Sequence, residues 1–275
     1  LKKLSELQHL TITGDYNIDD RVLTCLPRLQ SLHWLFPHHS FGDTVSKLTL
    51  LTRLSVDNDG YDKCLLFTPI SELNLAPLSR LLELDVSENV TFTGDLLSLT
   101  KLDVFHKDLI NKYTNLIDLS VCNWHGPMCD NLIKLESLRC YNSDISSMVF
   151  SALVSLTRLK IKQNYMFENV LRICGTNKDE FDLNQFMKLK ALRIPDTSIK
   201  ISLARLTLLE HLDVSQCSDV DISVIGLTGL TSLKANQSDL SDNALTQLTN
   251  LKKLNIKGCD RITKAGILKL TKLQR

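Results

Sequence analysis

Leucine recurs along the chain in a unit that reads Leu-x-x-Leu-x-x-Leu-x-apolar. The clearest copies occupy residues 206–214, 227–235 and 248–256, and each starts 21 residues after the one before. Alternate residues of a strand point to the same side, so the last two apolar positions enter a core and the residues around them face water. Self-similarity at this period predicts one supersecondary unit stacked many times.

The leucine of the predicted strand can be followed through most of the chain. Eleven positions keep this register: Leu10, Leu32, Leu54, Leu84, Leu119, Leu138, Leu159, Leu192, Leu212, Leu233 and Leu254. Residues 96–104 fit the same pattern, but their strand leucine, Leu102, lies only 18 and 17 residues from its neighbours. Repeats of this kind rarely fall below about 20 residues. We expect a real but compressed twelfth turn.

The repeat also predicts the architecture. Each strand pairs with the equivalent strand of the next turn, which gives a parallel sheet with right-handed crossovers. The return path has about ten residues, enough for short helices or 3-10 turns. This outer layer is wider than the ~4.8 Å strand spacing, so the sheet should be concave. We expect an α/β right-handed solenoid of 11 or 12 repeats, with residues 1–275 as a single domain.

The Leu-x-x-Leu-x-Leu core resembles the leucine-rich repeat family. In that family a small hydrogen-bonding residue follows the strand inside a tight turn, and here the position holds Asn89, Ser143, Asn164, Thr197, Cys217, Ser238 and Cys259. Residues 259–268 resemble the cysteine-containing subclass, whose members often sit behind an F-box, and the repeat lengths resemble the short intracellular subclass. The resemblance covers nearly the whole chain and implies a binding scaffold.

Two periods are longer than the rest and indicate insertions near residues 57–75 and 165–185. Insertions in solenoids go to loops on one face, and such loops can carry function. Met166, Val170, Leu171 and Cys174 are spaced as on one side of a helix, which we expect to pack on the core. At the other end, Leu270 and Leu273 would place the next strand leucine at position 276, so we expect a fragment without terminal caps.

Composition narrows the class of protein. Hydrophobic residues make up 43% of the chain and aromatic residues 6%, so the core must be aliphatic. With 32 Lys and Arg against 31 Asp and Glu, the net charge is +1, which argues against a dedicated nucleic-acid binder. No apolar run is long enough to span a membrane.

The eight cysteines are scattered along the chain, without the paired terminal clusters of extracellular leucine-rich repeat proteins. This favours a reducing, intracellular compartment, and we expect the cytoplasm. Two glycosylation sequons, at Asn89 and Asn236, point the other way, but Asn89 falls on a turn position expected to be buried. We give the thiols more weight.

No motif of a nucleotide-binding or hydrolytic enzyme occurs, so we expect neither catalytic activity nor a cofactor. Cys122, His125 and Cys129, with Cys140 as a fourth ligand, are the best candidates for a zinc site. Cys140 is predicted to point into the core, so we favour ordinary thiols and no metal. His38 and His39 are adjacent in an extended segment, where their side chains point apart, and we interpret them as loop residues.

Charged residues on the exposed strand positions occur in blocks. We predict that ten of them bind a partner: Glu83, Asp85, Asp118, Arg139, Arg158, Lys160, Lys162, Arg193, Asp213 and Lys234. The alternative is an ordinary solvated face, because strand positions that face water are usually polar. Like charges on neighbouring strands repel, however, and a partner could offset that cost.

The pattern therefore indicates a protein-protein interaction module that recognises a protein partner through the concave sheet. Two alternatives stay open: the substrate-receptor part of a ubiquitin ligase, and a structural subunit of a large assembly. Nucleic-acid binding through the basic block ranks last, because aromatic stacking platforms are lacking there.

The cysteine pattern yields a first testable prediction. All eight cysteines should be free, because their spacing fits turn and core positions on different repeats. Titration of the denatured, unreduced protein with a thiol reagent should count eight thiols per chain. Fewer than eight on material protected from air would contradict both the free thiols and the reducing compartment.

Overall fold

The computed structural model describes residues 4–13, 19–35, 41–57, 72–87, 90–104, 110–122, 131–141, 143, 153–162, 181–183, 185–195, 201–203, 205–217 and 226–274. The chain forms two compact units, Leu1–Cys122 and Asn123–Arg275, and each is described by itself. That the chain is a single domain stays a prediction.

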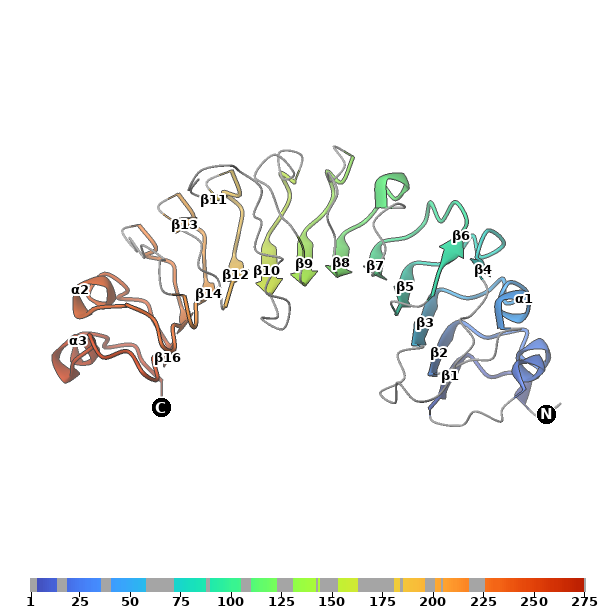
Figure 1. Ribbon diagram of the computed structural model, residues 1–275, viewed down its shortest axis with the longest axis horizontal. Coiled ribbons are helices and arrows are strands. Elements are labelled where there is room, and N and C mark those ends of the chain that lie inside the picture. Colours follow the sequence, from blue (N-terminus) through green and yellow to red (C-terminus); the bar gives the residue numbers. More distant parts are fainter. Residues whose placement is uncertain are drawn as a thin grey trace. The chain divides into compact units, whose positions relative to one another are not determined.

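The first unit is built on parallel strands that follow one another in chain order (Figure 1). They are β1 (His9–Ile12), β2 (Ser31–Leu35), β3 (Arg53–Asp57), β5 (Glu83–Val86), β7 (Lys101–Val104) and β8 (Asp118–Cys122). Their leucines lie opposite one another in the order Leu10, Leu32, Leu54, Leu84, Leu102 and Leu119. This is the register that the sequence predicts.

The compressed turn is confirmed. Strand β7 pairs with β5 on one side and with β8 on the other. Leu102 lies opposite Leu84 and Leu119, and its side chain is buried. Its two short periods therefore still provide enough chain for a complete turn.

The second unit repeats this arrangement. Its strands are β9 (Ser137–Tyr141), β10 (Arg158–Lys162), β12 (Ala191–Arg193), β14 (His211–Asp213), β15 (Ser232–Lys234) and β16 (Lys253–Asn255). Leu138, Leu159, Leu192, Leu212, Leu233 and Leu254 lie opposite one another along the unit. In both units the fold is a parallel-sheet solenoid with few short helices.

The core consists of leucine side chains stacked from turn to turn. In most turns all three leucines of the repeat are buried, as Leu206, Leu209 and Leu212 are. Full burial of one such side chain stabilises the fold by about 1.5–3 kcal/mol. The same contacts recur between successive turns, which explains why a regular leucine spacing is sufficient to specify the stack.

The second apolar strand position admits more varied side chains. Trp34 of β2 is buried and packs edge-on against Phe41, with ring centroids 5.3 Å apart. Cys140 of β9 is also buried, as predicted, and this burial raises the pKa of its thiol above the ordinary range. Neither the bulk of an indole nor a thiol disturbs the strand register.

The return segments contain short helices and 3-10 turns, as expected. Helix α1 spans Phe41–Val45, α2 spans Asp242–Leu245 and α3 spans Lys264–Leu268, and the 3-10 helices η2 and η3 span Asp20–Cys25 and Ile110–Lys112. Two small parallel sheets were not expected. Strand β4 (Leu73–Asn74) pairs with β6 (Phe92–Thr93), and β11 (Phe181–Asp182) pairs with β13 (Ile201–Ser202).

Most of the two predicted insertions lies outside the described residues. This includes residues 58–71 and 163–180, and with them the helix expected at Met166, Val170, Leu171 and Cys174. The described parts of both segments end in short strands, β4 and β11, which pair with the following turn.

Helices α2 and α3 of the second unit are joined by one carboxylate. Asp242 accepts hydrogen bonds from the backbone nitrogen of Thr263 at 2.8 Å and from its hydroxyl at 2.5 Å. Thr263 in turn caps α3 by accepting from the backbone nitrogen of Ala265 at 3.2 Å. These hydrogen bonds from Thr263 lower the pKa of the exposed Asp242 carboxyl. Asp242 therefore links two consecutive turns on the helical side of the repeat.

Glycine 266 provides a test of this link. A Cβ atom at Gly266 would lie 2.1 Å from Asp242 Oδ1, so Gly266→Ala must push the carboxylate away from Thr263. We expect a loss of about 1–3 kcal/mol, the usual cost of overpacking, seen as a lower Tm and faster amide exchange in α3. Gly229→Ala is the matched control, because its new Cβ would lie 3.4 Å or more from its nearest neighbours. Equal melting temperatures for the two variants would contradict the role given to Asp242.

Candidate binding surface

The exposed strand positions of the second unit align basic side chains in successive turns. Lys160 of β10 lies opposite Arg139 of β9 on one side and Arg193 of β12 on the other. Arg158 and Lys162 lie on the same face of β10 and are exposed. We call these five residues the basic cluster: Arg139, Arg158, Lys160, Lys162 and Arg193. The register predicted for Leu138, Leu159 and Leu192 places Arg139, Lys160 and Arg193 side by side, and the structure confirms this register.

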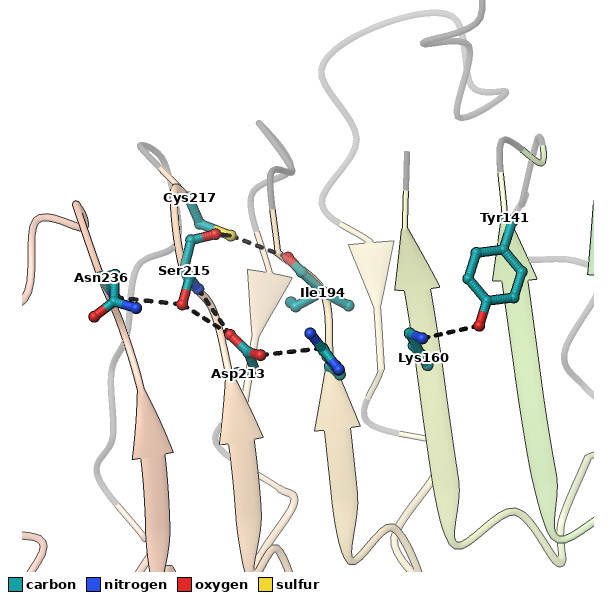
Figure 2. A network of polar contacts seen from close by, with 8 residues as sticks. Tyr141, Lys160, Ile194, Asp213, Ser215, Cys217 and Asn236 are labelled. Carbon is teal, nitrogen blue, oxygen red and sulfur yellow. Dashed lines mark hydrogen bonds and ion pairs between the residues drawn. The ribbon is translucent and has the colours of Figure 1, made fainter. Parts of the chain in front are cut away.

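Polar contacts order the central side chain of the basic cluster. Lys160 Nζ donates a hydrogen bond to the Tyr141 hydroxyl at 2.8 Å, and Figure 2 shows the two side chains pointing toward each other from neighbouring strands. The ammonium group also lies 4.8 Å from the centre of the Tyr141 ring. Tyr141 was not among the predicted site residues, although it is the last residue of β9 and lies opposite Lys162 in the sheet.

An acidic residue on the next strand borders the basic cluster. Asp213 of β14 lies opposite Arg193, and the two side chains form an ion pair of 3.1 Å. Asp213 also accepts a hydrogen bond from Ser215 Oγ at 2.9 Å, and Ser215 Oγ accepts one from the Asn236 backbone nitrogen (Figure 2). The repulsion expected along the basic positions is therefore relieved at Arg193. Lys234 follows Asp213 in the register and is exposed.

The predicted acidic block of the first unit is less uniform than the sequence indicated. Glu83 lies between two basic residues, with Arg53 Nε at 3.0 Å and Lys101 Nζ at 3.9 Å. These pairs are largely exposed and contribute little to stability, but they reduce the local negative charge. Asp118 follows Lys101 in the register and is partly exposed. The negative charge of this surface is thus partly neutralised at Glu83.

A polar row runs through the middle of the first unit. His33 Nδ1 lies 2.9 Å from Ser55 Oγ, and this hydroxyl donates to Asp85 Oδ2 at 3.1 Å. Asp85 lies opposite Asp103 of the next turn. Burial raises the pKa of Asp85, the Asp103 carboxylate raises it further, and the Ser55 hydrogen bond and His33 oppose the rise. The serine stands between the histidine and the aspartate, so Asp85 does not orient His33 as the third group of a catalytic triad would orient the base.

The small residues of the tight turn are buried and bonded, as predicted, wherever the structure describes them. Cys217 Sγ donates to the Ile194 carbonyl at 3.1 Å (Figure 2), and Ser238 Oγ donates to the Ala235 carbonyl at 2.8 Å. Cys259 Sγ donates to the same carbonyl of Ala235 at 2.7 Å. The hydroxyl and the thiols thus satisfy backbone groups inside the stack. Asn89, Asn164 and Thr197 lie outside the described residues.

The thiols among the described residues show no sign of metal or disulfide chemistry. Cys25, Cys122, Cys140, Cys217 and Cys259 form no disulfide with one another. No group of His, Cys, Asp or Glu in the described ranges is arranged to hold a metal ion. His125 and Cys129 of the zinc candidate lie outside these ranges, as do His38, His39, Cys64 and Cys174.

One set of exposed residues was missed at the level of sequence. In the turns that precede β9, β10, β12 and β14, four aliphatic side chains are more than half exposed. We call them the apolar row: Ile133, Val154, Met187 and Leu208. Each of them lies between the first two buried residues of its repeat. These are two leucines, except around Met187, where they are Phe186 and Leu189. The sequence does contain a signal for these four residues. The equivalent positions in the next two turns hold only small or polar residues, Thr228 and Gly229 and then Thr249 and Asn250, so an apolar residue at this position is not required by the repeat.

Comparison with known proteins supports the fold. No protein-family model matches the sequence, and no curated protein matches it. Among solved structures, the chain resembles the internalin InlF of Listeria monocytogenes, with a TM-score of 0.62 and 22% identity over 99% of this chain and 87% of that one. The functional domain of InlJ from Listeria monocytogenes, which includes a cysteine ladder, gives a TM-score of 0.62 and 21% identity over 98% of this chain and 58% of that one.

A third similar structure is TLR13 in its complex with ssRNA13, with a TM-score of 0.54 and 18% identity over 98% of this chain and 45% of that one. At these identities the likeness shows the fold alone. Together with the register of the strands, it identifies the fold as a solenoid of short leucine-rich repeats. None of the helices in the described part of the chain is long and apolar enough to cross a membrane.

The crowded carboxylates of the first unit yield a prediction about pH. The pKa of Asp85 is raised in the folded protein, so folding favours the protonated carboxyl over the carboxylate. The free energy of unfolding is therefore highest below the pKa of an unfolded aspartate, about 3.9, and falls as pH rises through the folded pKa of Asp85. Asp85→Asn should therefore raise the free energy of unfolding near pH 7.5 by up to about 0.5 kcal/mol, the usual range for a surface position. Urea unfolding measures this difference.

The same gain should vanish near pH 3.5, where Asp85 is protonated in both states. Asp260→Asn, an exposed aspartate in the second unit, serves as the control and should change stability little at either pH. A stability loss at pH 7.5 would show that the charged Asp85 stabilises the row.

Proposed function

We propose that this protein is a non-enzymatic interaction module that binds an acidic segment of a protein partner through the basic cluster. The observation that carries the proposal is the alignment of Arg139, Lys160 and Arg193 on the exposed face of three consecutive strands. Neighbouring strands of a sheet are ~4.8 Å apart. Holding like charges at this distance costs stability, and carboxylates of a bound partner would offset the cost.

The surroundings of the basic cluster favour a protein over a nucleic acid. Proteins that bind single-stranded nucleic acid present several aromatic platforms for the bases. On the described strands β9, β10, β12, β14, β15 and β16, Tyr141 is the one Phe, Trp or Tyr, and its hydroxyl is bonded to Lys160. TLR13 is seen in complex with single-stranded RNA, so RNA is a necessary competitor in any test.

Three other features agree with such a module. The exposed face is polar and continuous within the unit, and the partial neutralisation of Arg193 by Asp213 holds that guanidinium in place. The chain lacks the motifs of known catalytic sites. The scattered free thiols are consistent with a reducing compartment, and we include an intracellular location in the proposal.

Charge reversal tests the proposal. Arg158→Glu with Lys160→Glu should leave the fold intact, because substitutions at exposed positions usually change stability by less than about 0.5 kcal/mol. Binding of an acidic peptide, and capture of the protein's partners from its native source, should fall about tenfold or more and depend on salt. A thermal melt and quantitative mass spectrometry of the captured proteins measure the two effects.

Lys252→Glu with Lys253→Glu is the matched control. It makes the same change in charge on exposed residues at the far strand, β16, of the same unit. An equal loss of binding in both variants would show that the effect comes from the net charge of the protein and not from the basic cluster. Retention of single-stranded RNA by the wild type, lost on reversal of Arg158 and Lys160, would contradict a protein partner.

A further inference from the structure

The apolar row is built by a turn that recurs with the same geometry. In each case the backbone nitrogen of the later buried residue donates to the carbonyl three residues earlier. Leu135 bonds to Leu132 at 3.0 Å, Leu156 to Leu153 at 3.1 Å, Leu189 to Phe186 at 2.9 Å and Leu209 to Leu206 at 3.0 Å. Ile133, Val154 and Met187 take the first position inside this turn, and Leu208 takes the second. Equal turns on successive repeats therefore align Ile133, Val154 and Met187, and the next turn adds Leu208 one position further along.

Exposure on this scale requires an explanation. Ile133, Val154, Met187 and Leu208 are 55%, 61%, 62% and 53% exposed. Single exposed aliphatic side chains are normal, but their recurrence in four consecutive turns is a reason to consider an interaction site. The turn itself does not need apolar residues there, because Thr228 and Gly229 fill the same positions in the turn closed by Leu230 and Leu227 at 3.1 Å.

The spacing of the apolar row fits a helix better than an extended chain. Four turns of the solenoid at ~4.8 Å extend over about 14 Å. Helix positions i, i+4, i+7 and i+11 extend over about 16 Å at 1.5 Å per residue. Alternate residues of a strand would need about 20 Å for four contacts. A helix lying along the apolar row can therefore place one apolar side chain against each turn.

Charge indicates the polar flank of such a helix. Lys134 and Lys188 follow Ile133 and Met187 directly within their turns, and both are exposed. Carboxylates beside the apolar stripe of a bound helix would lie next to these ammonium groups. A second copy of this chain is a poor occupant, because the row offers on the order of 300 Å² of apolar surface, against the ~800 Å² per partner of a stable interface.

We propose that the apolar row binds an amphipathic α-helix of a protein partner, with its apolar stripe on Ile133, Val154, Met187 and Leu208 and an acidic flank beside Lys134 and Lys188. This site is separate from the basic cluster and does not depend on it. Its chemistry is that of helix recognition, in which anchors at helical spacing enter an apolar strip and charges fix the orientation.

A synthetic helix tests this proposal with the full chain. The probe is an 18-residue fluorescent peptide with leucines at its positions 3, 7, 10 and 14 and glutamates along one flank. Fluorescence anisotropy should show binding that falls about tenfold or more in the double variant Val154→Glu with Met187→Glu. A peptide with serines in place of the leucines should not bind, and one with lysines in place of the glutamates should bind more weakly.

Leu97→Glu is the matched control variant. Leu97 is 65% exposed and occupies the same turn position, closed by Leu99 and Leu96 at 3.0 Å, but it has no apolar neighbour at this position in the adjacent turns. It should bind the peptide within about twofold of the wild type. Circular dichroism checks that all variants fold, and Val154→Ser with Met187→Ser supplies a milder pair that should also weaken binding.

Several results would overturn the proposal. They are equal binding of the leucine and serine peptides, an equal effect of Leu97→Glu, binding by the wild type to vesicles of anionic phospholipid that Val154→Glu with Met187→Glu abolishes, and a dimer in sedimentation that the same variant dissociates. The variant Arg158→Glu with Lys160→Glu should still bind the peptide. If it does not, the peptide occupies the basic cluster and the apolar row is not its site.

Discussion

The whole structure depends on the stacking of leucine side chains from one turn onto the next. Each strand leucine is paired with the leucine of the neighbouring strand, from Leu10 to Leu119 in the first unit and from Leu138 to Leu254 in the second. A shift of one residue would turn these side chains toward water, at about 1.5–3 kcal/mol for each. The leucines therefore fix the register, and the register decides which exposed residues become neighbours.

Hydrogen bonds between turns reinforce that register. The nitrogens of Thr231 and Ser232 both donate to the Glu210 carbonyl, and the nitrogens of Thr157 and Arg158 both donate to that of Glu136. Threonine hydroxyls at this position add a bond to the same carbonyl, as at Thr157 and Thr231. Exposed side chains are thereby held one turn apart, so that the basic cluster and the apolar row are rows of fixed spacing and not loose groups of residues.

Much of this could be predicted from the sequence, because the repeat is a local signal. Leucine spacing located the strands that carry Leu10 to Leu254, including the compressed one at Leu102, but not the short strands β4, β6, β11 and β13. The same register places Lys160 between Arg139 and Arg193. Side-chain partners could not be predicted, since they depend on rotamers across turns. The pairing of Glu83 with Arg53, and of Lys160 with Tyr141, needed coordinates. The apolar row was not predicted, because the candidate binding residues came from the exposed strand positions and the row lies in the turns before the strands.

The register can be measured directly by cross-linking across the second unit. Arg139→Cys with Lys160→Cys places two thiols on paired positions of β9 and β10, at about the 4.8 Å strand spacing. Arg139→Cys with Lys162→Cys displaces one of them by two residues along the strand, to about 8 Å, beyond the reach of a disulfide. Mild oxidation to a disulfide, followed by peptide mapping, should join the first pair rapidly and the second pair poorly. Equal yields, or a faster reaction of the second pair, would contradict the register on which both proposed surfaces depend.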